Sequence, residues 1–367
     1  MLRATCGLGA SSHGPTAVDL ALAAAAGLPR RPDIAFLYVS DHLAGAAEAI
    51  RARVVERTGV RALGGTVGMA VAAGRSELSD APGVALLLVS APGAGVRELR
   101  LDARAPGASL VRDSVAIVHA DPLHAHAATA EDGALGTAFR VGGLTSTRTS
   151  SAQFDSSGSV ASGCTALVLD HGFSPRVATA QGVEGLGPLR RVTRAVRNIV
   201  VTLDGRPALN VLLEDLGVAP GTPTLDDDEV RRMAEGALVA VGLARRDHEA
   251  FLVRGLLGYD PERGALAIDH EPEPDGTLRF VRRSAAAARD DLRAQLDRLV
   301  EGSRRPPAAA LYFSCVARGQ ALFGRPGVEL DLIADALDDV PLAGFFGQGE
   351  VAGGEVHSHA GVLVLLG

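Results

Sequence analysis

The sequence contains no lysine, so all 36 of its basic residues are arginine. An arginine guanidinium stays protonated and cannot act as an amine nucleophile, which excludes Schiff-base chemistry. The P-loop and protein-kinase motifs also need a lysine, and both are therefore excluded. Tryptophan is missing and aromatic residues make up only 4% of the chain, so stacking platforms for nucleic-acid bases are not expected.

Cysteine is scarce as well. The three cysteines, Cys6, Cys164 and Cys315, are far apart and form no CxxC pair. This argues against a zinc knuckle or a thioredoxin-like site and favours a reducing, cytoplasmic setting. No apolar run reaches the length of a membrane span, and Asp19 interrupts the short apolar stretch near the start of the chain. The net charge of −7 argues against a nucleic-acid-binding surface over the whole protein.

The length of 367 residues suggests roughly two domains, and 47% hydrophobic residues predict a packed core. A segment rich in glycine and proline at 182–188 indicates a boundary just after it. The predicted domains are residues 1–190 and 191–367.

Three stretches of the chain share one pattern of strand, helix, strand ending in glycines, and closing strand. The closing strands are continuous apolar runs, as expected for strands that are covered on both faces. The pattern predicts an α/β fold of mixed β-sheets flanked by helices, built from duplicated strand–helix–strand–strand units in two halves. The expected strands are 33–40, 63–65 and 83–89; 114–119, 141–145 and 163–169; and 308–314, 342–346 and 361–366.

The region between the second and third stretches has a different pattern. Residues 196–203 predict a strand, and Asp204 and Gly205 after it are typical of a hairpin turn. Three further short strands are expected at 251–257, 265–268 and 277–281.

Several segments together resemble a known family. They are Ala120-Asp-Pro122 followed by Val141-Gly-Gly-Leu-Thr-Ser146, then Leu203-Asp-Gly-Arg-Pro-Ala-Leu209, Phe313-Ser-Cys-Val-Ala-Arg-Gly319, Val340-Pro-Leu-Ala-Gly-Phe-Phe346, and Gly349-Glu350. The arrangement resembles the FIST family, a bacterial sensory module with an N-terminal half, here 1–190, and a C-terminal half, here 191–367. The likeness covers nearly the whole chain.

The resemblance implies a stand-alone sensory protein that binds a small ligand, with an amino acid or another small carboxylate as the candidate. It implies signalling through a separate protein such as a kinase or cyclase, with no nucleic acid and no membrane involved. The resemblance implies no cofactor. Some members of the family sense nitric oxide with haem, so haem is the alternative. The resemblance favours a binding protein over an enzyme but leaves catalysis open, and no catalytic residue is assigned.

The segment around Cys315 is the first part of the candidate ligand site. Its small residues, Ser314 and Gly319 among them, would expose backbone N–H groups to an anion, and Arg318 could bind a carboxylate with its two-pronged guanidinium. A neighbouring arginine would also favour the thiolate form of Cys315. The alternative is a buried, inert cysteine beside an arginine that pairs with a surface acid.

The second part is a glycine-rich strand exit that contains one carboxylate. Glu350 could receive a ligand ammonium and Gln348 could orient it, so that together with Arg318 the site would suit a zwitterion. The alternative is a β-bulge or hairpin with a solvated glutamate. The predicted ligand-binding residues are Ser314, Cys315, Arg318, Gly319, Gly344, Gly347, Gln348, Gly349 and Glu350.

Two other kinds of site remain open on the sequence. His357 and His359 would point to the same side of an extended segment and could bind a metal or haem, although no third ligand is evident. Cys315 with one of these histidines and Glu350 could form the nucleophile, base and orienting group of a hydrolase or transferase. Neither spacing requires such a geometry.

Overall fold

The structure is a computed structural model that describes residues 2–27, 31–101, 114–130, 135, 136, 138–218, 228–230, 236–242, 251–273, 275–301 and 305–367. The chain divides into two units: unit 1 combines residues 1–180 with 291–367, and unit 2 comprises residues 181–290. Sheets of mixed strand direction with helices confirm the predicted α/β class. The boundary at residue 190 between family halves stays a prediction.

The described residues of unit 1 form three mixed sheets of six strands each. In spatial order the first comprises β1 (Arg3–Ala10), β6 (Gly83–Ser90), β2 (Ile34–Ser40), β3 (Ala62–Gly68), β10 (Gln153–Asp155) and β11 (Gly158–Val160). The second comprises β25 (Glu355–His357), β24 (Glu350–Ala352), β9 (Phe139–Leu144), β8 (Val115–Ala120), β12 (Cys164–Leu169) and β7 (Val96–Leu101). The third comprises β13 (Arg176–Ala180), β26 (Gly361–Leu366), β22 (Ala309–Cys315), β23 (Leu342–Gly347), β4 (Ala70–Ala73) and β5 (Ser76–Ser79).

The same three-strand arrangement occurs in each sheet. The first strand of each predicted stretch pairs in parallel with the glycine-containing strand and antiparallel with the closing strand. These trios are β2, β3 and β6; β8, β9 and β12; and β22, β23 and β26. The predicted strands of all three stretches are therefore confirmed, while their origin by duplication stays a prediction.

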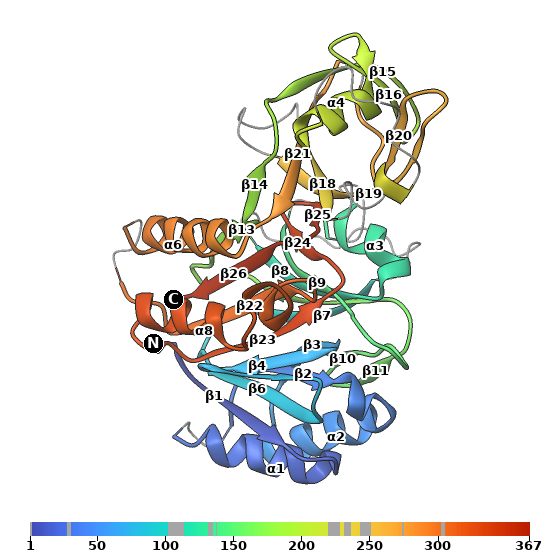
Figure 1. The fold of residues 1–367 in the computed structure, drawn as a ribbon. Helices are drawn as coiled ribbons and strands as arrows, with labels where there is room; N and C mark the ends of the chain where they lie inside the picture. Colours follow the sequence, from blue (N-terminus) through green and yellow to red (C-terminus); the bar gives the residue numbers. More distant parts are fainter. Residues whose placement is uncertain are drawn as a thin grey trace. The chain divides into compact units, whose positions relative to one another are not determined.

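A hairpin that follows each glycine-containing strand leaves its own sheet and joins another. The hairpin β4–β5, which follows β3, pairs with β23 of the third sheet. The hairpin β24–β25, which follows β23, pairs with β9 of the second sheet, and β10–β11, which follows β9, pairs with β3 of the first. The three sheets are thus linked in a cycle by exchanged hairpins (Figure 1).

The inner faces of the three sheets enclose a common core, to which β2, β8 and β22 contribute Phe36, Ile117 and Leu311. Helices cover the outer faces. The first sheet carries α1 (Gly14–Ala24) and α2 (Ala47–Thr58), the second carries the short α3 (Ala125–Thr129), and the third carries α6 (Ala285–Glu301) and α8 (Val328–Ala336). Burial on both faces explains why the central strands have continuous apolar sequences.

Aromatic rings from all three sheets meet inside this core. Tyr38 of β2 stacks on Phe345 of β23 with ring centroids 5.3 Å apart, and Phe313 of β22 meets Phe345 edge-on at 5.8 Å. His119 of β8 lies among them, fully buried, with its centroid 5.6 Å from that of Tyr38. Burial lowers the pKa of His119 to about 3, so its ring is neutral and acts as part of the core.

A glycine is required at one equivalent position in each trio, because the neighbouring parallel strand passes very close. A Cβ added at Gly344 would lie only 1.7 Å from the carbonyl oxygen of Tyr312. The corresponding separations are 1.8 Å for Gly65 and 1.9 Å for Gly142. No side chain fits at such separations, which explains the recurrence of glycine in these strands.

Among the residues of unit 2 that the structure describes, six antiparallel strands pair in a ring around a core that includes α4 (Ala208–Asp215). In ring order they are β21 (Thr277–Arg283), β15 (Arg190–Val196), β16 (Ile199–Leu203), β20 (Ala265–Ile268), β19 (Phe251–Asp260) and β18 (Ala237–Gly242), which pairs again with β21. The short β14 (Val183–Gly185) adds to β21.

The predicted strands at 251–257, 265–268 and 277–281 correspond to β19, β20 and β21, and the turn at Asp204 and Gly205 links β16 to β17 (Arg206–Pro207). The stretch 196–203 is not one strand, because Arg197, with a φ of 52°, turns the chain between β15 and β16. Among the described helices, none is long and apolar enough to cross a membrane.

Candidate functional site

The predicted site residues lie in unit 1, where the ends of β22 and β23 meet. Because these strands are parallel, Cys315 at the end of β22 lies directly beside Gly347 at the end of β23. Arg318 and Gly319 follow at the start of α7 (Gly319–Phe323), and Glu350 begins β24. The topology therefore brings the two sequence segments of the predicted site to one edge of the third sheet.

Arg318 is engaged by a carboxylate of the same chain. Its Nε donates to Oε1 of Glu329 at 2.8 Å, and Nη2 lies 2.8 Å from the same oxygen. Nη1 donates to the carbonyl oxygens of Ala180 and His359, at 3.4 and 3.3 Å. The side chain of Arg318 is 0% exposed and that of Glu329 is 2% exposed, so the pair is shielded from water.

The carboxylate of Glu329 accepts further hydrogen bonds from residues of β22 and α7. The Tyr312 hydroxyl donates to Oε1 at 2.7 Å, the Ser314 hydroxyl to Oε2 at 3.2 Å, and the Gly319 N–H to Oε2 at 3.4 Å. These bonds connect β22, α7 and the first turn of α8, where Glu329 lies. Sequence reasoning missed Glu329, although an acid that begins the helix after a buried arginine is the signal that could have identified it.

Glu350 is the second buried carboxyl group in this region and is 0% exposed. Its Oε2 accepts a 3.3 Å hydrogen bond from the Ala360 N–H, whereas Oε1 has no hydrogen-bond partner among the described residues. Burial raises the pKa of Glu350 well above its ordinary value, although the Ala360 N–H and the charge of Arg318 act in the opposite direction.

Cys315 lies next to this carboxyl group. Burial raises the pKa of the Cys315 thiol to about 12, and the neighbouring Glu350 adds to that increase. The nearby Arg318 lowers the pKa, but by less than burial raises it. The expected activation of a thiolate by Arg318 is therefore wrong, because burial raises the pKa of Cys315 by more than the arginine lowers it.

The remaining predicted residues have different roles. Gly319, with a φ of 51°, packs against the ring of Phe346, and Gly344 allows the close approach of β22. Gly347 accepts a hydrogen bond from Val316 N–H, and Gly349 accepts one from Leu144 N–H. Gln348 is exposed, so its side chain does not face the buried carboxyl groups.

The two candidate metal ligands are close to the site, but the described residues offer no third ligand beside them. His357 on β25 pairs across the hairpin with Glu350, and the backbone oxygen of His359 accepts from Arg318. Within the part of the chain that the structure describes, no group of three or more His, Cys, Asp or Glu side chains could hold a metal ion. A haem role for these histidines stays a prediction.

Comparison with known proteins agrees with the whole-chain likeness. The FIST N domain model matches residues 33–206 and the FIST C domain model matches residues 208–353. An uncharacterised protein of Mycobacterium tuberculosis (strain ATCC 25618 / H37Rv) is 34% identical over 318 residues, which cover 81% of this chain and 80% of that protein. An uncharacterised protein of Mycobacterium bovis (strain ATCC BAA-935 / AF2122/97) is 30% identical over 338 residues, with 87% and 86% coverage. The chain therefore belongs to the FIST family, whose domains are associated with signal transduction and sensing.

Proposed function

We propose that the protein is a sensor that binds a small molecule with an ammonium group, such as an amino acid, through the carboxyl group of Glu350. The observation that supports this is the buried Oε1 of Glu350, which has no hydrogen-bond partner among the described residues. A buried polar atom without a hydrogen-bond partner destabilises the protein. A ligand that donates a hydrogen bond to this atom would remove that cost, which favours binding.

An ammonium group fits this position better than a neutral donor. Its positive charge would stabilise the ionised form of Glu350, which burial disfavours. Binding of an ammonium compound would therefore shift Glu350 toward its ionised form and release the proton that the raised pKa favours. The resulting charge-assisted hydrogen bond is stronger than a bond between neutral groups.

The carboxylate of an amino acid would contribute less than its amine. Arg318, the cation expected to receive it, is already paired with Glu329 and is held by two backbone carbonyls. A ligand carboxylate would have to displace Glu329 and leave it buried without its cation, which is unfavourable. We therefore infer that the site selects its ligand mainly by the ammonium group.

The position of Glu350 also suggests how binding would produce a signal. Glu350 is the first residue of β24, at the point where the chain leaves the third sheet to pair with β9 of the second. The outer strand of this hairpin, β25, is only half-buried. A ligand at Glu350 would therefore alter the hairpin β24–β25, and a separate signalling protein such as a kinase or cyclase would respond to that change.

Calorimetric titration with amino acids tests the proposal. Each amino acid is compared with the amine that lacks its carboxylate and with the acid that lacks its amine. We expect binding of the amino acid and of the amine, with proton release that shows in buffers of different ionisation enthalpy. Glu350→Gln should weaken this binding about tenfold or more, because a hydrogen bond to a charged group is lost.

Glu355→Gln is the matched control, since Glu355 is a half-buried acid on the same hairpin. It should bind the same ligands with unchanged affinity. Hydrogen exchange should in addition show changed protection in β24 and β25 when the ligand is bound. A ligand response that is equal in the wild type and in Glu350→Gln, or the lack of any amine-dependent response, would contradict the proposal.

A further inference from the structure

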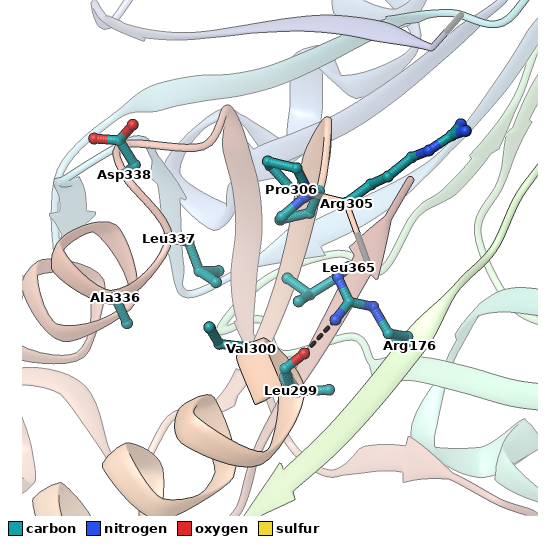
Figure 2. Close-up of a pocket in the computed structure, with 10 residues that line it drawn as sticks. Arg176, Leu299, Val300, Arg305, Pro306, Ala336, Leu337, Asp338 and Leu365 are labelled. Atoms are coloured by element: carbon teal, nitrogen blue, oxygen red, sulfur yellow. Dashed lines mark hydrogen bonds between the residues drawn. The ribbon is translucent and has the colours of Figure 1, made fainter. Parts of the chain in front are cut away.

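A pocket lies on the other end of the third sheet and is not used by the proposed function. Its volume is about 320 Å³, within the usual range for small-molecule sites. The last residues of α6 and α8 form two of its walls beside strand β26 (Figure 2). Its lining residues are Arg176, Leu299, Val300, Arg305, Pro306, Pro307, Ala336, Leu337, Asp338 and Leu365.

The pocket is separate from Glu350. Arg176 on β13 pairs with Leu365 on β26, and Leu365 pairs with Ala310 near the start of β22. Cys315, beside Glu350, is at the opposite end of β22, five residues from Ala310. At about 3.3 Å per strand residue, the two positions on β22 are roughly 17 Å apart. A ligand of the pocket would thus leave the Glu350 region unoccupied.

The interior of the pocket is apolar. Its lining includes the buried side chains of Leu299, Leu337 and Leu365. Val300, although apolar, is 45% exposed. Figure 2 shows these side chains between Arg176 on one side and Asp338 on the other. Covering such a surface with an apolar group removes it from water, which is favourable.

Arg176 gives the pocket its specific polar group. Its Nη1 donates to the carbonyl oxygen of Leu299 in the last turn of α6, which holds the guanidinium at the pocket wall (Figure 2). The side chain of Arg176 forms no other hydrogen bond or ion pair with the described residues, so Nε and Nη2 are available for a ligand. A guanidinium of this kind is suited to a carboxylate.

Two other charged side chains and two helix ends complete the electrostatics. Arg305 also lines the pocket and adds positive charge, whereas the carbonyl ends of α6 and α8 contribute partial negative charge. The carboxylate of Asp338 lies on the side away from Arg176 (Figure 2). The pocket is therefore positive at Arg176, apolar in the middle and negative at Asp338.

We infer that this pocket binds an apolar monocarboxylate, with the carboxylate on Arg176 and the hydrocarbon part against Leu299, Leu337 and Leu365. A dicarboxylate is disfavoured, because its second negative charge would be placed toward Asp338. A simple alcohol lacks the charge that Arg176 recognises, and an amine carries the opposite charge.

Titration calorimetry with octanoate, below its micellar concentration, tests this site. We expect saturable binding of octanoate and binding at least about tenfold weaker for 1-octanol, octylamine and the dicarboxylate suberate. Arg176→Gln should weaken octanoate binding about tenfold or more. The matched control is Arg3→Gln. Arg3, like Arg176, is the first residue of its strand, and Arg3 itself is exposed.

A second variant does not depend on Arg176. Ala336 is exposed at the pocket rim, so Ala336→Phe should leave the fold intact while its ring fills the pocket and abolishes octanoate binding. Glu350→Gln should leave octanoate binding unchanged. Equal affinity for octanoate and octylamine, or octanoate binding that survives both Arg176→Gln and Ala336→Phe, would overturn the inference.

Discussion

Arg318 and Glu329 form an ion pair in the interior of unit 1, with Nη2 of the arginine 2.8 Å from Oε1 of the glutamate. Removal of one partner leaves the other charge buried and uncompensated, which typically costs about 3–5 kcal/mol. We therefore predict that Glu329→Gln and Arg318→Met each lower the free energy of unfolding by about that amount. Urea denaturation followed by circular dichroism measures the change.

The double variant tests whether the two side chains stabilise the protein through their direct interaction. Replacement of both charges removes the uncompensated group, so Arg318→Met combined with Glu329→Gln should be less destabilised than the sum of the single variants. The exposed pair of Arg325 and Asp331 serves as the comparison, and Arg325→Met should change stability by less than about 1 kcal/mol. Additive effects of the two buried substitutions would contradict a direct interaction between these side chains.

The glycine of the parallel strand pair gives a second prediction. A Cβ at Gly344 would lie 1.7 Å from the Tyr312 carbonyl oxygen, so Gly344→Ala must push β23 away from β22. We expect a loss of about 3 kcal/mol in the free energy of unfolding, or failure to fold. Gly45→Ala is the control, because nothing lies within 4 Å of a Cβ added there. It should be neutral or slightly stabilising.

The sequence was sufficient to predict the trios of central strands, because their apolar runs and glycines are local signals. It did not predict the exchange of hairpins between sheets. The strand β4, for example, has a short apolar sequence that would fit the edge of several sheets, and its pairing with β23 depends on the packing of distant segments. The ring of strands in unit 2 was missed for the same reason, since pairing of β18 with β21 closes it over a long sequence separation.

The candidate site was partly predictable. Parallel pairing of β22 with β23 explains why the segments of Cys315 and Glu350 come together, as their motifs suggested. The partner of Arg318 was not predicted, because Glu329 belongs to neither motif and is brought in by α8. The protonated state of Cys315 also depends on burial, which spacing along the chain does not reveal.

The raised pKa of Cys315 leads to a third prediction. At pH 8 a thiol with a pKa of about 12 has almost no thiolate, so alkylation of native Cys315 by iodoacetamide should be very slow. Cys164, whose pKa burial also raises to about 12, should behave in the same way. Peptide mass spectrometry follows each site, and all three cysteines should react readily in urea. Fast native labelling of Cys315 would instead favour a nucleophilic role.

The buried carboxyl group of Glu350 gives a prediction about pH. Its pKa is raised in the folded state, so between about pH 4.5 and the folded value the native protein binds a proton that the unfolded chain has released. The contribution of Glu350 to stability is therefore complete below pH 4.5 and is lost as pH rises, by about 1.4 kcal/mol per pH unit in that interval.

Glu350→Gln removes this titration and keeps a group of similar size. The variant should have nearly wild-type stability at pH 4 and should become progressively more stable than the wild type as pH rises. The reason is that deprotonation of Glu350 stabilises the unfolded state of the wild type, whereas glutamine does not titrate. Urea midpoints measured at several pH values give the difference directly, with Glu355→Gln as the control for removal of a carboxyl group from the same hairpin. A difference that stays constant with pH would show that Glu350 is ionised in the folded protein, and binding of an ammonium ligand would then release no proton.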